Sequence, residues 1–131
     1  MNLQKNVLIV ENDFIQSYVL ERQLKNFKYN VVGTAMSGEE AITLSGKHKP
    51  DIVIMDISLE GKLDGIETAK KILESEDTSI IYISGHTRKL YQDRIKQTNY
   101  LDFIEKPFST TTLAAAINKW GKTEVSNLLS G

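Results

Sequence analysis

Short runs of apolar residues alternate along this chain with longer segments in which apolar residues recur every three or four positions. The runs cover residues 7–10, 31–32, 52–55, 80–83 and 103–104. Several are β-branched and apolar at both odd and even positions, as expected of parallel strands that are covered on both faces of a sheet. We therefore predict five strands.

The segments between these runs have helical spacing. Ser37 opens a capping-box pattern before the second of them, Ser109 is a predicted N-cap of the last, and Gly121 is predicted to lie just past its end. The segment 87–98 has the weakest helical pattern. The apolar stripes are Leu20, Leu24 and Phe27; Ala41 and Leu44; Ile66, Ala69, Ile72 and Leu73; and Leu113, Ala116, Ile117 and Trp120.

A strand followed by a helix, five times over, predicts an α/β fold: a doubly wound five-stranded parallel sheet with five helices on both faces. Residues 1–121 form one predicted domain, and the polar residues 122–131 form a tail that we expect to be loosely held. In such sheets, ligands bind outside the carboxyl ends of the strands.

Composition narrows the function without deciding it. The chain has 131 residues, a formal net charge of -1 and no cysteine. The charge balance argues against a nucleic-acid or membrane surface as the main partner, and the absence of cysteine excludes disulfides and thiolate metal sites. No apolar run is long enough for a membrane span, so we expect a soluble, cytoplasmic protein.

Polar and charged residues follow the strands where ligands would bind. Glu11-Asn12-Asp13 follows the first strand, Asp56 ends the third, Ser84 ends the fourth and Lys106 follows the fifth. Because the carboxyl ends of parallel strands share one edge, these groups are predicted to converge there. Asp13, with Gln16 three residues later, is predicted to cap a helix rather than to bind metal.

This set of groups suits phosphoryl transfer. Mg²⁺ is typically held by one or two carboxylates together with waters and a phosphate, and an Asp carboxylate can itself form an aspartyl-phosphate. Mg²⁺, the Ser84 hydroxyl and the Lys106 ammonium would each take one phosphoryl oxygen. We therefore interpret the site as a magnesium-dependent phospho-acceptor.

The sequence resembles the receiver domains of two-component response regulators over residues 5–121. The resemblance is carried by VLIVEND (7–13), PDIVIMDISLEGKLDGIETAKKI (50–72), IIYISGHT (80–87) and DFIEKPF (102–108), in this order. It implies a flavodoxin-like sheet with strand order 2-1-3-4-5. It also implies a signalling phospho-acceptor that assists its own phosphotransfer and dephosphorylation, rather than an enzyme acting on a separate substrate.

The resemblance assigns roles to individual residues. It makes Asp56 the phosphorylated residue and places Glu11, Asn12 and Asp56 at the metal, with the backbone carbonyl of Ser58. It makes Ser84 and Phe103 the switch residues and Lys106 the site lysine, with a Lys106-Pro107 peptide that is often cis in this family.

The resemblance also implies partners. These are a sensor histidine kinase or a histidine phosphotransfer protein as donor, and an output protein that binds the face of the fourth helix, fifth strand and fifth helix. A homodimer is a further assembly that it allows. The chain is either a whole single-domain regulator or a receiver from a longer protein.

The sequence departs from the family pattern at two places. Asn12 stands where the family usually has a second acid, which removes one formal charge. The loop after Asp56 lacks the usual proline and reaches Asp64-Gly65 one residue late. Asn12 keeps open a second function: a degenerate receiver that binds a partner without being phosphorylated. An aspartyl hydrolase is a weaker alternative, since the chain has no spare segment for a substrate cap.

Overall fold

The computed structural model describes the backbone of residues 5–130 and the side chains of residues 5–120. All five predicted strands and all five predicted helices are present. The strands are β1 Asn6–Val10, β2 Asn30–Ala35, β3 Ile52–Asp56, β4 Ser79–Ser84 and β5 Tyr100–Glu105; the helices are α1 Phe14–Asn26, α2 Gly38–His48, α3 Gly65–Ser75, α4 Arg88–Ile95 and α5 Thr110–Ser130.

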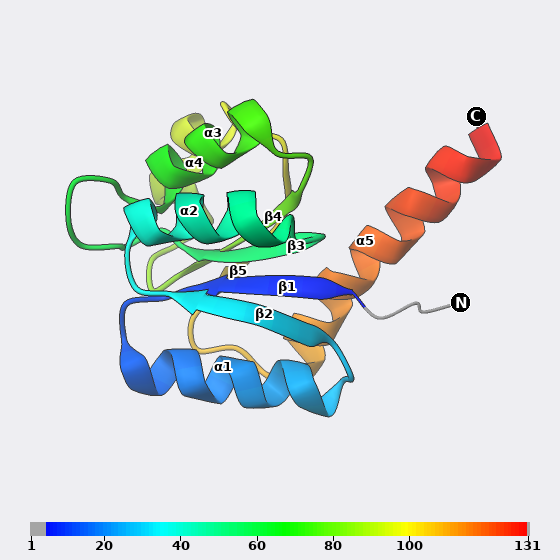
Figure 1. The fold of residues 1–131 in the computed structure, drawn as a ribbon, viewed down its shortest axis with the longest axis horizontal. Helices are drawn as coiled ribbons and strands as arrows, with labels where there is room; N and C mark the ends of the chain where they lie inside the picture. The colour runs from blue at the N-terminus through cyan, green and yellow to red at the C-terminus, as the bar shows by residue number, and fades with distance from the viewer. Residues whose placement is uncertain (1–4, 131) are drawn as a thin grey trace.

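The strands form one parallel sheet in the order β2-β1-β3-β4-β5, which confirms the expected topology. Helices α1 and α5 cover one face, and α2, α3 and α4 cover the other (Figure 1). Each face has its own core. Leu24 of α1 and Ile117 of α5 belong to the core on one side of the sheet, and Ile66 of α3 and Ile95 of α4 belong to the core on the other side.

Side chains cap four of the helices. The Asp13 carboxylate accepts from the backbone amide of Gln16 at 3.0 Å, which confirms its predicted capping role at α1. The Ser37 hydroxyl accepts a hydrogen bond from the backbone amide of Glu40 at the start of α2, and the Ser109 hydroxyl accepts one from the amide of Thr112 at the start of α5. Asp64 forms a complete capping box with Glu67 at α3. These caps fix where the chain leaves each loop at the edge of the sheet.

Helix α5 is longer than predicted. It does not end before Gly121 but continues through it to Ser130. A glycine inside a helix costs about 1 kcal/mol relative to alanine and does not forbid the helix, and no proline follows it. The boundary between a domain of residues 1–121 and a tail stays a prediction. No helix in the described part of the chain is long and apolar enough to cross a membrane.

Candidate functional site

The strand ends bring the predicted residues to one edge of the sheet. Glu11 follows β1 directly, Asp56 is the last residue of β3, and Ser84 is the last residue of β4. The register pairs Asp56 with Ile83, and Ser84 with Glu105, which places Lys106 one residue beyond this row. Adjacent strands therefore end at the same level and present their next residues together.

Lys106 joins two buried carboxylates. Its Nζ lies 2.8 Å from Oε1 of Glu11 and 3.0 Å from Oδ2 of Asp56. The Glu11 side chain is 1% exposed and the Asp56 side chain 4%, whereas the Lys106 side chain is 21% exposed. The two carboxylates are thus shielded from bulk water. The Lys106 ammonium, which balances their charge, reaches them from the partly exposed edge of the site.

Backbone amides bind the other oxygen of each carboxylate. The amide of Asp13 donates to Oε2 of Glu11 at 3.2 Å, and the amide of Ser58 donates to Oδ1 of Asp56 at 2.9 Å. Each carboxylate is therefore held at both oxygens, by one amide and one shared ammonium. This fixes the rotamers of the two acids before any ligand arrives.

The pKa values of the pair reflect this arrangement. Burial, together with the neighbouring Asp56, raises the pKa of the Glu11 carboxyl above its ordinary value. Burial alone would lower the pKa of Lys106, but its hydrogen bonds to Glu11 and Asp56 and their negative charges outweigh burial and raise it. The ammonium is therefore charged at neutral pH.

The Ser84 hydroxyl is fully buried beside this cluster. Its oxygen accepts from the backbone amide of His86 at 3.0 Å, and the carbonyl of Ser84 accepts from the amide of Lys106 at 2.7 Å. The hydroxyl proton makes no hydrogen bond among the described residues, so it is free to be donated. A Cβ added at Gly85, the next residue, would have no heavy atom within 4 Å, so Gly85 borders open space.

A cavity of about 580 Å³ opens over these groups. It brings together Glu11, Asn12, Asp56, Ser58 and Lys106, all named from the sequence. It adds Glu60, to which the sequence did not point, and Gln16, which the sequence indicated only as the capping partner of Asp13. Ser84 and Phe103 do not line it. The full lining is Glu11, Asn12, Asp13, Gln16, Asp56, Ser58, Glu60, Gly85, His86 and Lys106.

Phe103 lies on β5 opposite Tyr82 of β4 and packs, half-buried, against the core on the α2, α3 and α4 side. It is thus on the face of the sheet that carries α4. The Tyr82 hydroxyl, beneath α4, is bonded to Thr98 at 2.8 Å. Phe103, predicted from the resemblance as a switch residue, therefore lies on the same face of the sheet as α4.

Gly65 sets the shape of the loop that carries Ser58. A Cβ at this position would lie 2.1 Å from the backbone oxygen of Asp56 and 2.7 Å from the Cα of Ile57. No side chain fits there, so the start of α3 packs directly on the backbone of Asp56. The sequence showed the glycine as part of a motif, but only the fold shows why it must be one.

The donor set fits a hard divalent cation. The described residues contain no group of three or more His, Cys, Asp or Glu side chains able to hold a metal ion. Two carboxylates, Glu11 and Asp56, are nevertheless held near one another by the Lys106 ammonium. Asn12 and Ser58, which carry neutral oxygens, line the same cavity. Mg²⁺ uses few carboxylates and retains waters, so two acids and neutral oxygens are a suitable set.

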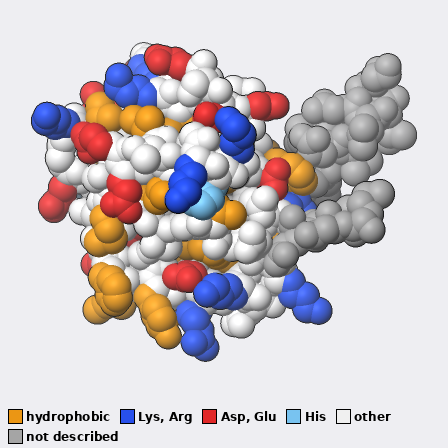
Figure 2. Space-filling view, in the orientation of Figure 1, with side chains coloured by type: hydrophobic (Ala, Val, Ile, Leu, Met, Phe, Trp, Pro, Cys, Tyr) orange, Lys and Arg blue, Asp and Glu red, His pale blue; other side chains and the backbone are white. Residues whose placement is uncertain are grey.

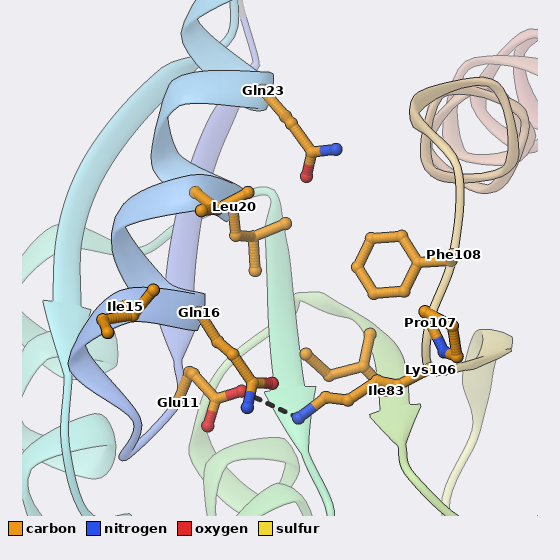
Figure 3. Close-up of a pocket in the computed structure, with 10 residues that line it drawn as sticks. Glu11, Ile15, Gln16, Leu20, Gln23, Ile83, Lys106, Pro107 and Phe108 are labelled. Carbon is orange, nitrogen blue, oxygen red and sulfur yellow. Dashed lines mark hydrogen bonds and ion pairs between the residues drawn. The ribbon is translucent and has the colours of Figure 1, made fainter.

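A second, largely apolar groove of about 470 Å³ runs from the same cluster along α1. In Figure 3, Leu20 of α1 faces Phe108 and Pro107 across it, and the Lys106 ammonium reaches Glu11 at its end. Figure 2 shows hydrophobic side chains on the surface over α1. These exposed residues of α1 are Phe14, Ile15, Tyr18 and Val19, of which Phe14 is 75% exposed.

Comparison with known proteins identifies the family. The family description for the response regulator receiver domain matches residues 7–118. The chain belongs to this family. The receiver domain is 32% identical over 119 residues to the chemotaxis protein CheY of Thermotoga maritima, covering 90% of this chain and 98% of that protein.

Other relatives are longer. The receiver domain is 32% identical over 113 residues to the transcriptional regulatory protein PdtaR of Mycobacterium tuberculosis, covering 86% of this chain but only 55% of PdtaR. It therefore spans about half the length of that relative. Among solved structures, the signal receiver domain of a modulated diguanylate cyclase from Desulfovibrio desulfuricans G20 superposes with a TM-score of 0.86 at 32% identity, over 94% of this chain and 98% of that one.

These matches confirm the fold and the family that the sequence motifs indicated. The protein is a receiver domain of two-component signalling. The Lys106-Pro107 peptide is cis, as the resemblance implied.

Proposed function

We propose that this domain acts in the cytoplasm, where Asp56 accepts a phosphoryl group, with Mg²⁺ bound, from the phosphohistidine of a sensor histidine kinase or a histidine phosphotransfer protein. The observation that carries this proposal is the position of Asp56: a buried carboxylate, bonded to the Lys106 ammonium at 3.0 Å, at the floor of an open cavity. A carboxylate with only a structural role would have no reason to face a cavity of this size.

The transfer is a displacement at phosphorus. One oxygen of the Asp56 carboxylate attacks the phosphorus, the P–N bond to the donor imidazole breaks, and its electron pair stays on the imidazole nitrogen. The product is an acyl phosphate. Water later attacks this phosphoryl group and releases inorganic phosphate, which regenerates the Asp56 carboxylate without a separate enzyme.

Residues around Asp56 supply the charge stabilisation. The Lys106 ammonium can move its hydrogen bond from the carboxylate to a phosphoryl oxygen, and the free hydroxyl proton of Ser84 can be donated to another. Mg²⁺, held by Glu11, Asp56 and the neutral oxygens of Asn12 and Ser58, would neutralise charge shared by the carboxylates and the phosphoryl group.

Output follows from a shift between two conformations. The phosphoryl group favours the state in which Ser84 bonds to it, and β4 carries this change toward Phe103 on β5 and toward α4. Helix α4 buries only Ile95, so few apolar contacts fix it in one position. We propose that the α4, β5 and α5 face is where an output partner detects the change.

The groove along α1 supports a protein donor. It is apolar, it adjoins exposed Phe14 and Ile15, and it ends at Glu11 and Lys106 of the acceptor site. An apolar helix face seated there would bring a histidine next to Asp56. Exposed apolar surface of this kind marks an interaction site.

Intact-mass spectrometry tests the proposal against the degenerate-receiver alternative. Incubated with acetyl phosphate and Mg²⁺, the wild-type domain should gain one phosphoryl group, and Asp56→Asn and EDTA-treated samples should gain none. A wild-type domain that is never labelled by acetyl phosphate or by a phosphohistidine donor would favour the phosphorylation-independent binding module.

A further inference from the structure

A groove of about 420 Å³ between α4 and β5 is lined by cations and by no carboxylate. Its lining residues are Arg88, Lys89, Gln92, Lys96 and Tyr100. The three cations are exposed, and none forms an ion pair with a carboxylate in the part of the chain that the structure describes. The residues that line this groove therefore carry a net positive charge.

Arg94, another basic residue of α4, differs from these three cations because it is paired with a carboxylate. Arg94, on another side of α4, pairs with Asp64 at 2.7 Å. Residues 88, 92 and 96 recur at a spacing of four and so share one side of the helix, the side facing Tyr100. Glu105 accepts from the backbone amide of Arg88 but is not a lining residue.

Two contacts with Tyr100 hold the Arg88 guanidinium in place. Its guanidinium lies 5.6 Å from the centroid of the Tyr100 ring and also donates to the Tyr100 hydroxyl. These two contacts with Tyr100 restrict the position of the guanidinium and leave further N–H donors unused. A guanidinium presented in this way pairs well with a carboxylate through two parallel hydrogen bonds.

We propose that this groove binds an acidic segment of the output partner, with carboxylates of the segment at Arg88, Lys89 and Lys96. The inference rests on the proposed function only in taking the groove as an output surface. Nucleic acid fits less well, because a phosphate backbone needs an extended basic surface, and this chain has a formal net charge of -1. The cations here occupy one short groove.

The groove is also placed to respond to phosphorylation. One wall is α4, which begins four residues after Ser84, and the other is β5, which carries Phe103. A displacement of α4 relative to β5 changes the spacing between the lysines and Tyr100. The fit of an acidic segment would therefore depend on the state of the acceptor site.

Fluorescence anisotropy tests the proposal on the unphosphorylated domain at low salt. The probes are a short fluorescein-labelled peptide rich in glutamate and a labelled single-stranded RNA of equal charge. The variant Lys89→Gln with Lys96→Gln should bind the peptide about fivefold more weakly, as expected for the loss of two exposed ion pairs. The control Lys47→Gln with Lys71→Gln removes the same charge elsewhere and should bind like wild type.

Two results would overturn the proposal: equal weakening in both double variants, or tighter binding of the RNA than of the peptide. The peptide titration uses the unphosphorylated domain without any phosphodonor, which separates this test from that of the proposed function. Peptide binding can fail while Asp56 is phosphorylated, and phosphorylation can fail while the peptide still binds.

Discussion

Replacing Lys106 with methionine should destabilise the resting domain. Methionine matches the length of the aliphatic stem but leaves Glu11 and Asp56, 1% and 4% exposed, without their ammonium partner. At about 3 Å and an effective dielectric constant of 20, each lost ion pair has a gross attraction of about 5 kcal/mol. Desolvation of the ammonium and the entropy of ordering a lysine offset much of this.

The net cost follows from burial. Breaking a fully buried ion pair costs about 3–5 kcal/mol, mainly because a charge is left buried and unpaired. Lys106 is 21% exposed and the site opens into a cavity, so water reaches the two carboxylates once the lysine is gone. We expect a loss of about 2 kcal/mol in the free energy of unfolding at neutral pH.

The loss should depend on pH in a defined direction. The pKa of Glu11 is already raised by burial in the wild type, and removing the ammonium raises it further. Between the ordinary pKa and the raised one, the folded variant binds more protons than the unfolded chain. Its stability therefore increases as pH falls through this range, and the deficit should shrink from neutral pH toward pH of about 5.

Urea unfolding, monitored by circular dichroism in EDTA, measures the stability deficit of Lys106→Met at neutral pH and at pH of about 5. Lys25→Met is the matched control: Lys25 lies 3.0 Å from Glu21, but the two side chains are 59% and 31% exposed, so the change should cost about 0.5 kcal/mol or less. If Lys106→Met matched this control, or if its deficit did not shrink on acidification, the ammonium would not be what holds the two carboxylates.

Three further predictions concern the loops around the site. Asn12→Asp should tighten Mg²⁺ binding about tenfold in calorimetry, because it adds one negative charge at the cavity; unchanged affinity would remove Asn12 from the metal site. Gly65→Ala should cost more than about 2 kcal/mol in urea unfolding, because its Cβ would lie 2.1 Å from the Asp56 carbonyl, whereas Gly85→Ala should cost under about 1 kcal/mol. Asp64→Ala should lower stability by about 1–2 kcal/mol, since it removes the α3 cap; a thermal melt like wild type would contradict this.

The sequence predicted the elements whose pattern is local. Ser84 and Asp56 end their strands as expected, because an apolar run followed by a polar residue marks both the strand and its end. Asp13 and Ser37 cap helices as expected, because the capping interaction spans only three residues. These features need no knowledge of the rest of the chain.

Features that depend on tertiary contacts were not predictable in the same way. Strand β5 runs over Tyr100–Glu105 and not only over residues 103–104, because Asp102, which interrupts the apolar pattern, lies on the edge strand and pairs with Lys119 at 2.9 Å. The ion pair of Lys106 with Glu11 joins residues 95 positions apart. The carboxylate oxygens that Lys106 contacts are set by which strands end side by side, and only the fold shows this.

The central claim is that Asp56 carries the phosphoryl group. The most direct measurement is peptide mass spectrometry of the labelled domain after borohydride reduction, which converts an acyl phosphate into a stable alcohol at the residue that bore it. We predict a single reduced site, at Asp56, that is absent from unlabelled protein. Reduction at Glu11 or Asp13, or an undiminished phosphoryl gain in Asp56→Asn, would contradict the account.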